Sequence, residues 1–185
     1  GTDAFSQGMP GWVVCVGLVT PEGVPRAGIV YAPAWEELFV APGDGSVLRN
    51  GKPIEDVSFP EGITPRTNLM GDSRIHRFFD LGAFPGKVRS VGSTALHLCQ
   101  MLIYDGVLAA IGRPCKIWDV VAAHAVVRAA DYRVELFDGR PLDYEGLLRG
   151  ARTRDLVIGG ASDGLGLLRE AFPRRKKLAE QSTRS

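Results

Sequence analysis

The sequence predicts an α/β protein built as a layered α+β sandwich, in which an antiparallel sheet portion precedes a smaller α/β half. In residues 1–62, short β-branched segments are separated by tight turns, a pattern typical of an antiparallel meander. From residue 63 onward, strand-like and helix-like segments alternate, which indicates an α/β layer. A shift toward Pro and Gly in residues 59–65 sets the predicted boundary between residues 1–62 and 63–185.

The first part contains three apolar, β-branched segments with turn signals between them. Strands are predicted over residues 12–20, 25–31 and 37–40. Asn50-Gly51 follows them, and this pair is typical of the two-residue turn of a β-hairpin.

In the second part, segments with the apolar pattern of strands alternate with segments that have the apolar pattern of helices. Strands are predicted over residues 67–71, 88–91, 107–111, 133–137 and 156–160. Helices are predicted over residues 73–81, 93–104, 119–130 and 164–172. The helix over 119–130 is almost entirely apolar, so we expect it to be buried.

Composition narrows the possible partners. The 185 residues are 45% hydrophobic and 23% charged, which is ordinary for a globular protein. The 22 basic and 21 acidic residues give a net charge of +1, so no general basic field argues for nucleic acid. No apolar run approaches the roughly 20 residues of a membrane span. Cys15, Cys99 and Cys115 are far apart, which favours reduced thiols and a cytoplasmic protein.

Two segments could carry chemistry. Gly92-Ser93-Thr94 lies between a predicted strand and a predicted helix, where free backbone N–H groups suit an anion or a hydroxyl. Asp119 stands at the start of the next helix and could bind a hard divalent cation. For both Ser93 and Asp119 the alternative is an ordinary helix N-cap. The three histidines, His76, His97 and His124, do not form a metal-ligand pattern.

Several motifs occur in one order along the chain. They are Gly1-Thr2 with Phe5, Gly8 and Pro10; Asn50-Gly51-Lys52-Pro53-Ile54; Arg89 with Gly92-Ser93-Thr94-Ala95; and Ile117-Trp118-Asp119 with Ala122-Ala123. Together they resemble the signatures of the inositol monophosphatase family over the chain as far as about Leu142.

The resemblance implies a fold of the inositol monophosphatase and fructose-1,6-bisphosphatase type. It also implies a cytoplasmic homodimer and a site with two or three Mg²⁺ ions, inhibited by lithium. In such a site metal ions bind the substrate phosphate and polarise the attacking water. By resemblance, Asp119 is a metal ligand and the Thr2 hydroxyl orients the water. Gly1 supplies backbone near the phosphate, and Gly92–Thr94 contacts the alcohol part of the substrate.

The chain also departs from the family pattern. The family carries a DPxD motif immediately before the position of Gly1, and those carboxylates supply most metal ligands. We therefore expect roughly 80–90 further N-terminal residues, about what half of a two-layer domain needs. We also expect residues 1–185 alone to be catalytically silent, with an apolar patch and an unpaired strand edge over residues 12–40.

Inositol-preferring members carry a Glu shortly before the Trp-Asp pair, whereas residues 110–116 contain no acid. Arg113 and Lys116 stand in this stretch and would favour a second anionic group on the substrate.

Three functions follow from these observations. The first is a magnesium-dependent phosphomonoesterase, a phosphoric monoester hydrolase acting on a small phosphorylated alcohol or sugar such as inositol monophosphate. The second is a 3′-phosphoadenosine nucleotide (bisphosphate) phosphatase of the same superfamily. The positions of Pro114 before Asp119 and of His124 after it resemble the pattern of that branch. The third is a non-catalytic scaffold or dimerisation module that has lost the metal site.

Overall fold

Two five-stranded sheets form the frame of the protein in the computed structural model, which describes residues 1–55 and 57–172. The first sheet is antiparallel throughout and has the order β1-β2-β3-β4-β5. Its strands are β1 (Val14–Val19), β2 (Pro25–Ala32), β3 (Glu37–Ala41), β4 (Leu48–Arg49) and β5 (Lys52–Pro53). Asn50 and Gly51 connect β4 and β5 with φ values of 49° and 78°, as a type I′ hairpin turn requires. The predicted meander is therefore confirmed.

The second sheet is mixed and has the order β7-β6-β8-β10-β9. Its strands are β6 (Asn68–Gly71), β7 (Lys87–Arg89), β8 (Val107–Gly112), β9 (Arg133–Leu136) and β10 (Val157–Gly160). Strand β6 pairs in parallel with β7 and β8, whereas β10 pairs antiparallel with β8 and β9. The predicted boundary at residues 62 and 63 falls in the segment between the two sheets.

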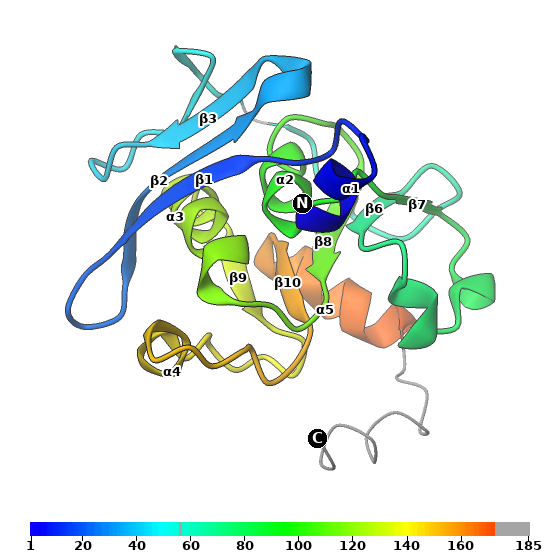
Figure 1. The fold of residues 1–185 in the computed structure, drawn as a ribbon. Coiled ribbons are helices and arrows are strands. Elements are labelled where there is room, and N and C mark those ends of the chain that lie inside the picture. Colours follow the sequence, from blue (N-terminus) through cyan, green and yellow to red (C-terminus); the bar gives the residue numbers. More distant parts are fainter. Residues whose placement is uncertain (56, 173–185) are drawn as a thin grey trace.

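Helices α2 (Thr94–Gln100) and α3 (Val121–Ala129) lie between the two sheets (Figure 1). Six of the nine residues of α3 are buried, because this helix packs on β1, β2 and β3 on one side and β9 on the other. Helix α5 (Ser162–Ala171) covers the opposite face of the second sheet through Leu165 and Leu168. The order of sheet, helix pair, sheet and helix confirms the predicted layered sandwich.

The helix predicted over residues 73–81 is wrong. This segment forms only two 3-10 turns, η2 (Ile75–Arg77) and η3 (Leu81–Ala83). The Asp72 carboxylate accepts a hydrogen bond from the Arg74 N–H, and Asp80 accepts one from Gly82. Such local side-chain bonds to the backbone compete with helical hydrogen bonding.

Three other predicted helices differ at their ends, and two short helices were not predicted. Helix α2 ends at Gln100, α3 begins at Val121 after the 3-10 turn η4 (Ile117–Asp119), and α5 begins at Ser162. The additional helices are α1 (Thr2–Ser6) and α4 (Tyr144–Leu148). The basic residues that follow Phe172 lie outside the described residues.

One face of the first sheet is uncovered in the described part of the chain. Its apolar side chains are Val14, Val16, Leu18, Ile29 and Tyr31, and Val16 and Leu18 are 61% and 60% exposed. Strand β1 lies at the edge of this sheet. These observations confirm the expected apolar patch and strand edge. Among the described residues, no helix is long and apolar enough to cross a membrane.

Candidate active site

A cavity of about 680 Å³ brings together segments that are far apart in the sequence. Seven of the eight predicted site residues line it: Gly1, Thr2, Gly92, Ser93, Thr94, Arg113 and Asp119. Lys116 is the exception, because its ammonium donates a hydrogen bond to the Gly150 carbonyl instead. We call this space the main cavity.

Close backbone contact holds the N-terminal segment against the loop before α2. A Cβ atom at Gly11 would lie 1.5 Å from the Val91 carbonyl oxygen, so only glycine fits there. Helix α1 begins at Thr2 and reaches the same loop, since Ala4 Cβ would lie 3.1 Å from a Cβ at Gly92. These contacts place the exposed Thr2 beside Gly92 and Ser93 on one cavity wall.

Neither predicted residue caps its α-helix through its side chain, although Asp119 forms part of a capping box in the η4 turn. Ser93 stands at the N-cap position of α2, but its side chain makes no capping hydrogen bond. The N-cap of α3 is Val120 rather than Asp119. Asp119 Oδ2 instead accepts a hydrogen bond from the Lys116 N–H at 3.1 Å, inside the η4 turn. The N-cap interpretation of Asp119 is therefore wrong, and this half-buried carboxylate lines the main cavity.

Arg113 forms an ion pair that the sequence did not suggest. Its Nε atom lies 2.9 Å from Asp72 Oδ2. Burial raises the pKa of Asp72, but the Arg113 hydrogen bond, the Arg74 N–H and the charges of both arginines outweigh burial and lower it. Asp72 is therefore ionised at neutral pH, and it neutralises part of the positive charge that Arg74 and Arg113 bring to the main cavity.

Four further cavity residues were missed by sequence reasoning: Asp72, Arg74, His97 and Arg152. Asp72 and Arg74 directly follow the buried strand β6, and polar residues after a buried strand were a usable signal. Arg152 lies outside every motif, and we find no sequence signal for it. With Asp3 and Asp119, the main cavity contains three acids and three arginines, so any anion must be held by local contacts.

His97 is buried and lines the main cavity, whereas His124 is half-buried and is not among the residues that line it. His97 Nε2 accepts a hydrogen bond from the Val91 N–H at 2.9 Å, which fixes the loop before Gly92. Burial lowers the pKa of His97 to about 4. His124 Nδ1 lies 2.8 Å from the Tyr144 hydroxyl, and burial lowers its pKa to about 4 as well. Both imidazoles are therefore neutral at physiological pH, whereas His76 is exposed.

The described residues do not fit a magnesium site on their own. No group of three or more His, Cys, Asp or Glu side chains among them could hold a metal ion. Of the cavity acids, Asp72 is paired with Arg113 and Asp119 already accepts one backbone hydrogen bond. Magnesium needs several oxygen ligands to compensate its hydration. The carboxylates of the described residues are therefore insufficient to form a magnesium site.

Comparisons with known proteins agree with the fold and motifs. A sequence model described as the inositol monophosphatase family matches residues 1–156. Inositol monophosphatase 1 of Solanum lycopersicum is 32% identical over 145 residues, covering 70% of this chain and 50% of that protein. The 3′(2′),5′-bisphosphate nucleotidase CysQ of Escherichia coli K12 is 29% identical over 153 residues, covering 78% of this chain and 58% of that protein. The chain thus spans about half the length of these relatives.

A solved structure shows the same fold. The inositol monophosphatase from Anabaena superposes with a TM-score of 0.74 over 92% of this chain and 69% of its own. Its sequence identity to this chain is 24%, so this likeness supports the architecture alone.

Proposed function

The chain belongs to the inositol monophosphatase family, and from this premise we propose that its main cavity binds the substrate of a phosphoric monoester hydrolase. The substrate class is a small phosphorylated alcohol or sugar, such as inositol monophosphate. The observation that carries the proposal is the meeting of Thr2, Gly92–Thr94 and Asp119 around one cavity, since they come from separate family motifs.

We assign each residue a role that its position allows. The backbone of Gly1 lies near the phosphate, and the exposed Thr2 hydroxyl orients the attacking water. Gly92, Ser93 and Thr94 contact the alcohol part of the substrate. Asp119 is the carboxylate of this chain that we assign to a metal ion. Arg113 remains a contact for an anionic group, whereas the Lys116 ammonium is engaged with Gly150 and acts within the loop.

A second candidate, a bisphosphate nucleotide phosphatase, is favoured by Gly112 and the cavity-lining residues next to it, Thr94 and Arg113. A Cβ atom at Gly112 would lie 2.4 Å from Thr94 Cγ2, so an acidic side chain cannot replace this glycine without moving Thr94. Residues 110–116 contain no acid, and Arg74, Arg113 and Arg152 line the cavity. Such a wall suits a substrate with two anionic groups better than a neutral polyol.

Binding is the primary measurement, because Asp119 alone does not hold magnesium firmly against hydration. Isothermal titration calorimetry of residues 1–185 should detect inositol 1-phosphate and adenosine 3′,5′-bisphosphate, but not inositol. The phosphorylated compound that binds with the higher affinity identifies the substrate class. Binding of neither would favour the non-catalytic scaffold and overturn the proposal. Phosphate release by this chain with magnesium would overturn the conclusion that its carboxylates are insufficient.

Asp119 is tested by Asp119→Asn in the same titrations. Without metal, removing this negative charge should tighten phosphate binding about two- to fivefold, because like charges near 4 Å cost about 1 kcal/mol in water. Added magnesium should leave the order of the two affinities unchanged, because Asp119 alone does not hold the ion against its hydration. Equal affinities for both proteins in both conditions would show that Asp119 does not face the ligand.

A further inference from the structure

The loop between α4 and β10, residues 149–156, is hydrogen-bonded to the segment that contains Arg113 and Asp119. Thr153 makes the connection, and it is 7% exposed. Its N–H donates to the Cys115 carbonyl at 2.9 Å, and its Oγ1 accepts from the Cys115 N–H at 3.0 Å. Because buried backbone groups are costly to leave unpaired, these two bonds fix the two loops relative to each other.

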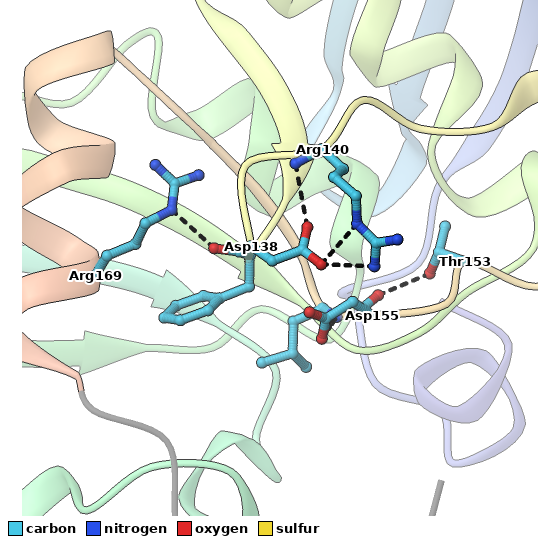
Figure 2. A network of polar contacts seen from close by, with 7 residues as sticks. Asp138, Arg140, Thr153, Asp155 and Arg169 are labelled. Atoms are coloured by element: carbon cyan, nitrogen blue, oxygen red, sulfur yellow. Dashed lines mark hydrogen bonds and ion pairs between the residues drawn. The ribbon is translucent and has the colours of Figure 1, made fainter. Parts of the chain in front are cut away.

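Two more contacts surround the same point. The Thr153 hydroxyl also donates to the Asp155 carbonyl at 3.0 Å, as Figure 2 shows. On the other side, the Lys116 ammonium donates to the Gly150 carbonyl. Arg152 lies between the bonded residues Gly150 and Thr153, so its backbone is held in place although its side chain is exposed.

The charge of Arg152 is not neutralised by a neighbour in the described part of the chain. Three nearby arginines are paired: Arg113 with Asp72 at 2.9 Å, Arg149 with Glu145 at 2.6 Å and, in Figure 2, Arg140 with Asp138 at 2.6 Å. Among the described residues, Arg74 and Arg154 form no ion pair either, but Arg154 does not line the main cavity and Arg74 adjoins the ionised Asp72. For Arg152, no carboxylate of the described residues is recorded within ion-pair distance, and its side chain lines the main cavity.

We propose that Arg152 binds a second anionic group, a phosphate, on the phosphorylated substrate, and that Thr153 is the residue that positions it. The inference rests on the proposed function and narrows its substrate class to bisphosphorylated compounds. A guanidinium offers a planar fork of donors that matches phosphate geometry. Arg113 is less suited to this task, because Asp72 already occupies its Nε side.

The experiment compares adenosine 3′-monophosphate with adenosine 3′,5′-bisphosphate, which differ by one phosphate group. Calorimetric titration of residues 1–185 should show tighter binding of the bisphosphate. Arg152→Ala should weaken bisphosphate binding about five- to tenfold, the effect of losing a charge-assisted hydrogen bond. Affinity for the monophosphate should stay within about twofold.

Arg154→Ala is the matched control. Arg154 is exposed and lies two residues away; it shares a neighbouring hollow with Arg152, but it does not line the main cavity, as Arg152 does. This variant should leave both affinities unchanged. If Arg152→Ala weakens both ligands equally or neither, or if the wild type does not prefer the bisphosphate, the inference is overturned while the proposed function stands. If the wild type binds neither nucleotide nor inositol 1-phosphate, both are overturned.

The role of Thr153 is tested by the same comparison of affinities for the bisphosphate and the monophosphate. Thr153→Val keeps the side-chain shape but removes the acceptor for the Cys115 N–H, so it should reduce the bisphosphate preference as Arg152→Ala does. Thr153→Ser keeps the hydroxyl and should restore the preference. Loss of stability with an unchanged preference in Thr153→Val would show a merely structural role and would overturn this part of the inference.

Discussion

A methyl group at Gly28 tests how closely α3 is held against the first sheet. Gly28 lies in β2, and a Cβ atom there would lie 2.2 Å from the Ala122 carbonyl oxygen and 2.9 Å from its carbonyl carbon. Both atoms belong to the α3 backbone, so no side-chain rotation relieves the overlap. Overpacking of this kind typically costs about 1–3 kcal/mol. We expect Gly28→Ala to lie at the upper end, lowering the free energy of unfolding by about 3 kcal/mol.

The assay is urea denaturation followed by circular dichroism, with Gly166→Ala as the control. Gly166 lies in α5, and no atom lies within 4 Å of a Cβ placed there. Alanine should therefore raise the free energy of unfolding by about 0.5–1 kcal/mol through helix propensity. Because α3 follows Asp119 directly, Gly28→Ala should also weaken phosphate binding. If both variants shift the urea midpoint in the same direction, the close contact between β2 and α3 is refuted.

Two further predictions concern pH and the uncovered face of the first sheet. His97 and His124 have pKa values of about 4 in the folded protein against 6.5 for the free side chain. The unfolded chain therefore binds more protons between these values, and stability falls as the pH drops through this window. Urea denaturation at pH 7 and pH 5 should show a loss of about 2 kcal/mol per histidine. Equal stability at both pH values would contradict the desolvation of His97 and His124. Leu18→Lys should reduce concentration-dependent self-association in size-exclusion chromatography with light scattering while changing the free energy of unfolding by no more than about 0.5 kcal/mol. Unchanged association would show that this apolar face is not what brings copies together.

Local patterns were sufficient for most of the architecture. The alternation of apolar residues predicts β1, β2 and β3, and Asn50-Gly51 predicts its hairpin, because strand pairing across a tight turn is encoded over few residues. The positions of Ser93 and Asp119 at predicted helix starts, and the family resemblance for Thr2, identified three residues that the fold brings to one cavity. The helix expected over residues 73–81 failed because the Asp72 and Asp80 side chains bond to nearby backbone N–H groups.

The parts of the site that were missed depend on contacts between distant segments. Arg152 lines the main cavity, and its neighbour Thr153 is bonded to Cys115, 38 positions away in the chain. Arg113 and Lys116 are three residues apart, yet one meets Asp72 and the other meets Gly150. Neither of these contacts can be predicted from local periodicity. The sequence analysis therefore gave Arg113 and Lys116 the same role, although they have different partners in the fold.

The central claim is that the main cavity binds a phosphorylated small molecule through Thr2 and Gly92–Thr94. It is tested most directly by titrating ¹⁵N-labelled residues 1–185 with inositol 1-phosphate and following the backbone amide signals by NMR. The account predicts saturable shifts at Thr2, Ser93, Thr94 and their cavity neighbours, and none at Val16 on the uncovered face of the first sheet. Absence of shifts, or shifts centred on β1 and β2, would contradict it.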